Sequence, residues 1–383
     1  DYNRWLPRSG AEGPGGHNLF YAGIHYLLFK GMDMIGFTDP QGKRYIIRLL
    51  HAALSMAVVV LGYRIAERMG GKKAARMAGL LLALLWFFPF ISVRNLIEFT
   101  CVPFLMWGTW ILMRKERYKS AIVQGLIAGG ILGLAFSMRF QSLIYIGGMG
   151  LALLINRRWA AAIATGFGIL ISSFICLGSI DMAIWGYPYA ELIAYIDYNA
   201  HHYGEYITGP WYQYLLVIFA ILVPPLSFFL VFGMFRDAFL NWRKNLLIFL
   251  PVIIFLVFHS YFPNKQERFI LPIIPFIIIM GTAGWVSFLE ISRFWKKHPR
   301  LLKASMAFFW AINIVFLLAI STTYSKRARV ESMSYLHRYN GINNILLENS
   351  NRANINLQPM YYMGQWATYT PVSTTHPVSA IPQ

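Results

Sequence analysis

Two cations stand in a short polar turn between two apolar stretches of the sequence. The turn lies within HSYFPNKQERFILPIIPF, residues 259–276, and contains Lys265, Glu267 and Arg268. Charged side chains at the edge of a membrane are costly, so they often indicate function. Arginine presents a planar fork of donors and lysine a point charge, and together they suit a phosphate group. The turn therefore predicts a site for a lipid phosphate, although a charged hairpin that only keeps the turn in water would have the same composition.

A second polar segment, YIDYNAHHYGEYITGPWYQYL at 195–215, is crowded with aromatic residues. The rings of Tyr203 and Trp211 could stack on the faces of sugars, because aromatic side chains combine an apolar body with a polar edge. We expect these two residues, together with His202 and with Glu267 of the turn, to bind the sugar or the acceptor. The alternative is a belt of aromatic residues at the membrane surface.

Two further arginines, Arg94 and Arg139, each stand where an apolar stretch meets a polar turn. Either guanidinium could reach the phosphate expected at 259–268, and either could simply anchor its helix at the membrane surface. A metal site is not expected, because the adjacent His201 and His202 would not share a helix face and the sequence has no matching acidic cluster.

The elements that must position these side chains are membrane-spanning helices. Of the 383 residues, 57% are hydrophobic and only 13% are charged, whereas about 25% are charged in a typical soluble protein. A helix needs about 20 mostly apolar residues to cross a bilayer. We therefore expect an all-α polytopic membrane protein with about ten transmembrane helices. The apolar stretches are 45–63, 77–93, 97–113, 120–138, 140–156, 159–180, 211–235, 245–262, 269–290 and 303–322.

The net charge of +18 is distributed unevenly between the two ends of these stretches. Short loops rich in Lys and Arg stay in the cytoplasm, so the bilayer accounts for the charge and nucleic acid is not an expected partner. The asymmetry places the loop at 181–210, the turn at 259–268 and both termini outside the cytoplasm. The basic clusters are Arg64, Arg68, Lys72, Lys73 and Arg76; Arg114, Lys115, Arg117 and Lys119; Arg157 and Arg158; Arg236, Arg243 and Lys244; and Arg293, Lys296, Lys297, Arg300 and Lys303.

Three segments divide the sequence. Residues 1–44 form an external loop, in which 17–37 suits an amphipathic helix lying on the membrane surface. Residues 45–322 form the transmembrane domain, and 323–383 form an extracytoplasmic C-terminal segment that mixes a short helical pattern at 329–340 with irregular chain. Because the sequence starts outside the cytoplasm and without Met, a cleaved signal or a first transmembrane helix should precede it, and we expect the helix together with part of the first external loop. We also expect the C-terminal segment to be incomplete.

At the turn and the aromatic loop the sequence resembles a known family. NKQERFILPIIP resembles the HKExRFxxPxxP signature of membrane mannosyltransferases that use a polyprenyl-phosphate-linked sugar, including those of N-glycan and GPI-anchor synthesis. Asn264 replaces the signature His, and Gln266 replaces its Glu, although Glu267 is adjacent. YGEYITGPWYQYL resembles the YGxxPWxxYL external loop of the family, with a two-residue difference in length. The matching residues are Lys265, Arg268, Phe269, Pro272, Pro275, Tyr203, Gly204, Pro210, Trp211 and Tyr214.

The resemblance implies the GT-C fold, with a catalytic Asp in the first external loop, often in an HPDE motif. No such motif is present here, and the nearest acids, Asp1 and Glu12, do not match it. We therefore expect the catalytic base to precede Asp1. Asp197 and Glu205, in the aromatic loop, are the alternative bases within the sequence.

The activity that the resemblance implies is that of an inverting membrane glycosyltransferase. It would move a hexose such as mannose from a polyprenyl-phosphate donor to a lipid-linked or exported acceptor, on the outer face of a bacterial-type inner membrane. Lys265 and Arg268 would stabilise the charge of the leaving phosphate. The sequence has no nucleotide-binding glycine loop, and no cofactor is expected besides the lipid-linked donor. The alternative is a transporter or flippase for a lipid-linked saccharide, which the break at Pro224–Pro225 inside an apolar stretch favours.

Overall fold

The computed structural model describes residues 13–203, 207–324, 326–348 and 358–372. The chain divides into two compact units. The helical unit contains Gly13–His25 and Arg48–Thr322, and the C-terminal unit contains Tyr26–Ile47 and the residues from Thr323 onward. All the side chains of the candidate site lie in the helical unit.

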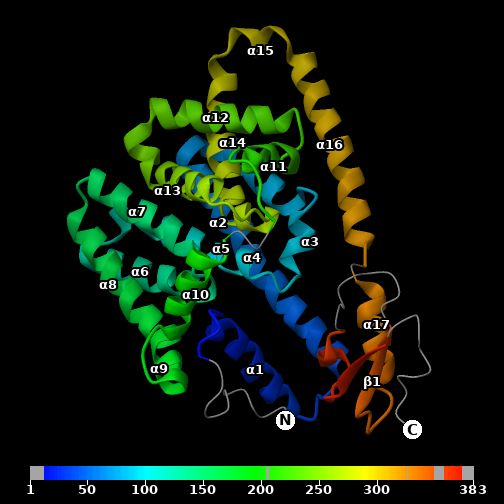
Figure 1. Cartoon of the computed structure of the whole chain (residues 1–383). Helices are drawn as coiled ribbons and strands as arrows, with labels where there is room; N and C mark the ends of the chain where they lie inside the picture. The colour runs from blue at the N-terminus through cyan, green and yellow to red at the C-terminus, as the bar shows by residue number, and fades with distance from the viewer. Residues whose placement is uncertain (1–12, 204–206, 325, 349–357, 373–383) are drawn as a thin grey trace. The chain divides into compact units, whose positions relative to one another are not determined.

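Helices account for most of the described chain (Figure 1). In chain order the elements are α1 (Leu19–Met34), α2 (Pro40–Leu84), α3 (Phe88–Ser92), α4 (Ile97–Thr100), α5 (Val102–Met113), η1 (Lys115–Arg117), α6 (Ala121–Met138), α7 (Ser142–Ile155), α8 (Trp159–Ser173), η2 (Phe174–Gly178), α9 (Ser179–Trp185), α10 (Ala190–His201), α11 (Gln213–Ile221), α12 (Leu226–Leu240), α13 (Trp242–Tyr261), η3 (Glu267–Ile273), α14 (Ile274–Ile291), α15 (Arg293–Lys297), α16 (Pro299–Thr322), α17 (Arg327–Leu336), β1 (Asn344–Glu348), η4 (Met360–Tyr362) and β2 (Thr368–Val372).

The helices confirm an integral membrane protein. Within the described residues, six helical segments are long and apolar enough to cross a bilayer, or seven if one bent pair counts as a single span. The expected number of about ten stays a prediction, because some apolar stretches form helices shorter than the roughly 20 residues that a span needs. α5 has only 12 residues and α7 only 14.

Two of the expected spans form one helical element, α2, which folds back on itself. The break is at Gly71, whose φ of 76° is in the left-handed region that favours glycine. On either side of the break the two halves pack together, since Gly62 lies against Leu82. Gly79 lies against Tyr63 in the same way. The basic residues between the two apolar stretches therefore lie at the tip of a helical hairpin.

The apolar stretch at 211–235 is not the single helix that was expected. It forms α11 and α12, which are bent by 116° relative to each other across the break that contains Pro224 and Pro225. Proline lacks an N–H group and disfavours helical geometry at the residue before it, so consecutive prolines end the first helix.

Small residues let the remaining helices of the unit pack closely. A Cβ built on Gly129 of α6 would lie only 2.2 Å from the carbonyl oxygen of Thr165 in α8. In the same way Gly148 of α7 lies against Pro251 of α13, and Figure 1 shows α7 beside α13. Close approach of this kind supplies the van der Waals contact that holds helices together in a membrane.

The C-terminal unit contains a small sheet that the sequence did not predict. β1 and β2 pair in parallel, with Asn344 opposite Thr368. Around them Met333 of α17, Met363 and Ala367 form a small apolar core. The helical pattern expected at 329–340 corresponds to α17, whereas part of the chain expected to be irregular forms these strands.

Candidate active site

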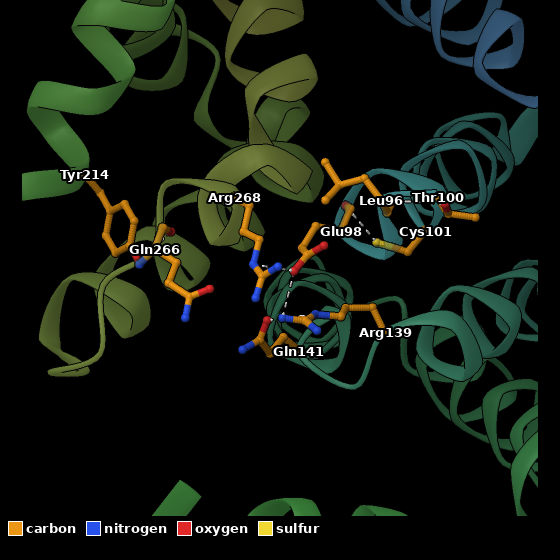
Figure 2. Close-up of polar contacts among 9 residues, drawn as sticks. All are labelled: Leu96, Glu98, Thr100, Cys101, Arg139, Gln141, Tyr214, Gln266 and Arg268. Atoms are coloured by element: carbon orange, nitrogen blue, oxygen red, sulfur yellow. Dashed lines mark hydrogen bonds and ion pairs between the residues drawn. The ribbon is translucent and has the colours of Figure 1, made fainter. Parts of the chain in front are cut away.

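Three separate elements bring one carboxylate and two guanidinium groups together (Figure 2). Glu98 belongs to α4, Arg139 follows α6, and Arg268 lies in η3. Arg139 Nη2 lies 3.3 Å from Glu98 Oε1, and Arg268 Nε lies 3.2 Å from the same oxygen. Two of the four cations expected to bind the donor phosphate thus share one acidic partner.

Burial within this group increases from Arg268 to Glu98. The exposed fraction of the side chain is 54% for Arg268, 19% for Arg139 and 3% for Glu98. A buried carboxylate is unstable without charged partners, so the two arginines make the burial of Glu98 possible. Two cations around one anion leave a net positive charge. Because the Arg268 side chain is exposed, part of this charge lies at the protein surface. The group is therefore suited to bind an anion from outside.

Neighbouring side chains fix both guanidinium groups. Arg139 Nε donates a hydrogen bond to Gln141 Oε1 at 3.0 Å. The guanidinium carbon atoms of Arg139 and Arg268 lie 5.5 and 5.8 Å from the centre of the Phe269 ring. Contacts of this kind favour a cation over an aromatic face. Since both arginines contact Phe269 and Glu98, they are held in place before any ligand arrives.

Lys265, the other cation of the turn, faces inward and has a different environment. Its Nζ donates to the backbone carbonyls of His259 and Ser260, each at 2.7 Å, and to that of Phe262. These carbonyls belong to the end of α13 and the residue that follows it, where the last carbonyls of a helix lack intrahelical partners. Lys265 is 2% exposed, and burial lowers its pKa from the ordinary lysine value. Lys265 therefore caps the C-terminus of α13, because its three N–H donors all bond to backbone carbonyls there.

The two segments that resemble the family motifs lie in direct contact. Lys265 N donates to Ile207 O at 2.9 Å. The Tyr214 hydroxyl lies 3.2 Å from both the backbone N and the backbone O of Gln266. Tyr214 is fully buried, and Figure 2 shows its ring beside Gln266. The aromatic loop therefore supports the backbone of the turn that ends in Arg268.

A cavity of about 190 Å³ opens beside Arg139. Its wall includes Gly16, His17 and Asn18 from the start of the described chain, and Tyr195 of α10. Burial raises the pKa of Tyr195, so its hydroxyl is neutral at physiological pH. Together these groups give the cavity donors and acceptors next to a cation, as a sugar and a phosphate require.

The segment that closes this cavity is fastened by Glu191. The carboxylate of Glu191 accepts from the backbone N of His17 at 2.8 Å and from Trp185 Nε1 at 3.1 Å. Asn18 Nδ2 donates to the carbonyl of Ser137 at the end of α6. Glu191 is 3% exposed, and these bonds fix the position of the cavity wall.

Other residues expected at the site make contacts of their own. The Arg94 guanidinium lies over the Phe90 ring, 3.8 Å from its centre. Glu267 is exposed. Asp197 is exposed too and lies 3.3 Å from His201 Nδ1. Positions 195 and 197 face about 200° apart around a helix, so Asp197 points away from the cavity that Tyr195 lines.

Two aromatic side chains of the loop after α10 are exposed. Tyr203 and Trp211 are 51% and 67% exposed. His202 stacks on Tyr198 with the ring centres 4.4 Å apart. Glu205 lies outside the described residues. The described part of the chain contains no group of three or more His, Cys, Asp or Glu side chains that could hold a metal ion.

Sequence reasoning did not single out Glu98 as the residue that joins the site. The signal that could have found it is an acidic residue within NLIEFTCVPF, in an otherwise apolar setting. An ionisable group at such a position indicates function and predicts a cationic partner. Which cations would pair with it depends on tertiary structure.

Comparison with known proteins identifies the family of the chain. The model of the Alg9-like mannosyltransferase family matches residues 18–369. GPI mannosyltransferase 3 of Kluyveromyces lactis is 25% identical over 226 residues, which cover 54% of this chain and 36% of the relative. Alpha-1,2-mannosyltransferase ALG9 of Mus musculus is 26% identical over 237 residues, which cover 57% of this chain and 38% of the relative. The matched region thus spans less than half the length of either relative.

Solved structures show the same fold. The crystal structure of ArnT from Cupriavidus metallidurans bound to undecaprenyl phosphate aligns with a TM-score of 0.55 at 14% identity, covering 88% of this chain and 64% of ArnT. The oligosaccharyltransferase of Archaeoglobus fulgidus aligns with a TM-score of 0.50 at 13% identity, covering 86% of this chain and 48% of that protein. The GT-C fold that the resemblance implied is therefore confirmed. Because the family model matches nearly the whole length of this chain, the chain belongs to the Alg9-like mannosyltransferase family.

Proposed function

We propose that the chain carries the donor-binding part of a membrane mannosyltransferase. It would take mannose from a polyprenyl-phosphate donor and transfer it to a lipid-linked or exported glycan acceptor. The reaction would take place on the extracytoplasmic face of a bacterial-type inner membrane. The family supports the class of sugar, and a polyprenyl carrier is supported by the undecaprenyl phosphate bound in the structural neighbour ArnT.

The observation that carries the proposal is the pair of arginines on Glu98. Arg268 uses Nε for the carboxylate, which leaves the N–H groups of its two terminal nitrogens for an anion. Arg139 stands beside the cavity that would take the sugar. A phosphate bound at Arg268 would thus lie next to the space for the sugar that it carries.

The reaction that suits this arrangement is a single displacement with inversion. The oxygen of the acceptor hydroxyl attacks the anomeric carbon of mannose, the bond from that carbon to the phosphate oxygen breaks, and its electron pair stays on the phosphate. A base takes the proton of the hydroxyl. Negative charge grows on the phosphate as the bond breaks, so fixed guanidinium groups stabilise the transition state more than the bound donor.

The test is an assay with purified protein and a synthetic polyprenyl-phosphate mannose. With a glycan acceptor present, the protein should release free polyprenyl phosphate, together with an acceptor that is one mannose larger. Release should stop when the acceptor is omitted. Movement of intact donor across the liposome membrane without cleavage would instead indicate a flippase. Transporters often contain broken helices, and the bent α11–α12 pair is of this kind.

A further inference from the structure

The ends of α5, α7 and α13 opposite the Glu98 group form a second charged site. α7 begins at Ser142, close after Arg139, and ends at Ile155, next to Asn156. Fourteen residues of helix span about 21 Å. α5 likewise leads from the region of Glu98 to Arg114, and α13 leads from Arg243 to Tyr261, shortly before the turn that contains Lys265. The site at the far ends of these helices is therefore separate from the candidate active site.

A cavity of about 570 Å³ lies among these far ends. Its wall carries the cations Arg68, Arg158, Arg243 and Lys244 and the apolar side chain of Leu247. Ligand pockets in proteins have volumes of about 300–1,000 Å³, so this one has room for a head group. The wall includes no carboxylate among the residues that the structure describes.

The charge of the cavity is only partly compensated. Arg68 Nη2 lies 2.8 Å from Glu116 Oε2. For Arg158, Arg243 and Lys244, the described part of the chain supplies no carboxylate within ion-pair distance. Three uncompensated cations around one cavity repel one another, and an anion bound between them would remove that repulsion.

Two of these cations, Arg158 and Lys244, are held by the protein before any ligand binds. Arg158 is half-buried, and its terminal nitrogens donate to Leu112 O at 2.8 Å and to Gln124 Oε1 at 2.9 Å. These bonds use two of its five N–H donors and leave three. Lys244 Nζ lies 3.4 Å from Met69 O at the tip of the α2 hairpin.

We propose that this cavity binds the phosphate head group of an anionic phospholipid. The apolar Leu247, and the position of the cavity at the ends of membrane helices, favour a lipid over a free phosphate. Basic pockets between transmembrane helices on the cytoplasmic side are known to bind anionic lipid head groups. The positive-inside rule explains why this face is basic, but it does not require the cations to share one cavity.

The test measures lipid binding to the purified full chain in nanodiscs. Nanodiscs of phosphatidylglycerol and phosphatidylcholine are used, and the lipid retained by the protein is counted by native mass spectrometry. The wild type should retain phosphatidylglycerol in preference to phosphatidylcholine. In the double variant Arg243→Gln/Lys244→Gln, that preference should fall about tenfold or more, as expected for lost charge-assisted hydrogen bonds.

The matched control also removes two positive charges from the predicted cytoplasmic face, but at positions outside the cavity. Lys296→Gln/Lys297→Gln in α15 removes two exposed lysines and should leave the preference within about twofold of the wild type, because surface charges contribute little. The single variant Arg243→Gln, at an exposed position, gives a second reading if the double variant does not fold, and it too should reduce the preference.

Three results would overturn the proposal. One is an equal loss in the cavity variant and the α15 variant, which would mean general attraction to an anionic surface. Another is a wild type that retains both lipids equally. The third is displacement of the retained lipid by excess inorganic phosphate alone, which would show that the cavity takes a free anion.

Discussion

Arg139 and Arg268 contact the same oxygen of Glu98, at 3.3 and 3.2 Å, although they belong to different turns of the chain. Sharing one oxygen holds the two guanidinium groups close together in spite of their repulsion. A phosphate that approaches from the exposed side of Arg268 meets a positive charge whose position is already set. The loss of entropy on binding is then smaller than for flexible cations.

Replacement of Arg268 by alanine should lower mannose transfer by about 30- to 1000-fold, because one charge-assisted contact to the leaving phosphate is worth roughly 2–4 kcal/mol. The control is Arg94→Ala, since the Arg94 guanidinium lies over the Phe90 ring and outside the matched signature; this change should cost less activity. Release of polyprenyl phosphate measures both. An Arg268→Ala protein that folds and transfers at the normal rate would exclude the phosphate role.

Glu98→Gln should destabilise the protein by about 3–5 kcal/mol, because it leaves the largely buried Arg139 guanidinium without its anion. Polyprenyl phosphate supplies a replacement anion, so it should raise the Tm of the variant more than that of the wild type. Glu290→Gln serves as control. The Glu290–Lys73 pair is exposed, and its loss should cost less than about 1 kcal/mol. Equal Tm shifts with the lipid in variant and wild type would contradict the proposed anion site.

Tyr214→Phe removes the hydroxyl that holds the backbone of Gln266. The loss should cost about 1 kcal/mol of stability, and it should lower kcat by about tenfold through misplacement of Arg268. Tyr212→Phe changes an exposed neighbour and should have little effect on either quantity. In an Arg268→Ala background, Tyr214→Phe should cost no further activity, because the two changes act on the same contact. Additive losses would mean that Tyr214 acts independently of Arg268.

The orientation of the chain can be tested by cysteine labelling in intact spheroplasts. Both native cysteines, Cys101 and Cys176, are buried, so single introduced cysteines can be followed. An impermeant maleimide should label Tyr203→Cys on the aromatic loop, and it should not label Lys73→Cys or Lys297→Cys in the basic clusters. The charge asymmetry is the physical reason. The opposite labelling pattern would reverse the orientation.

The sequence predicts the site better by segment than by side chain. The charge pattern predicts the turn at 259–276 and the aromatic loop at 195–215 on the same side of the membrane, and the structure brings their backbones into contact. The direction of the Lys265 side chain could not be predicted from the sequence. Its signature position suggested a phosphate ligand, but a long flexible side chain can also turn back to the nearest unpaired carbonyls, as it does here.

Apolar composition predicts which segments form helices, but it does not predict where a helix breaks. The apolar stretch at 211–235 is long enough for one span, yet Pro224 and Pro225 divide it into a bent pair. The break in α2 depends on a single glycine, Gly71, which stands next to another glycine in the sequence. Composition indicates how much of a segment is apolar, whereas the direction of the chain depends on one or two backbone angles.

The shortness of α7 has a consequence for the lipid around the protein. At about 21 Å the helix is shorter than the roughly 30 Å hydrocarbon core of a bilayer. Local thinning of the bilayer is one way in which such hydrophobic mismatch is relieved. Thinning would lower the membrane surface toward Arg139, which precedes α7, and a donor lipid could then reach the arginines without leaving its leaflet. Membrane thickness would thus become a determinant of transfer rate, independent of the chemistry at Glu98.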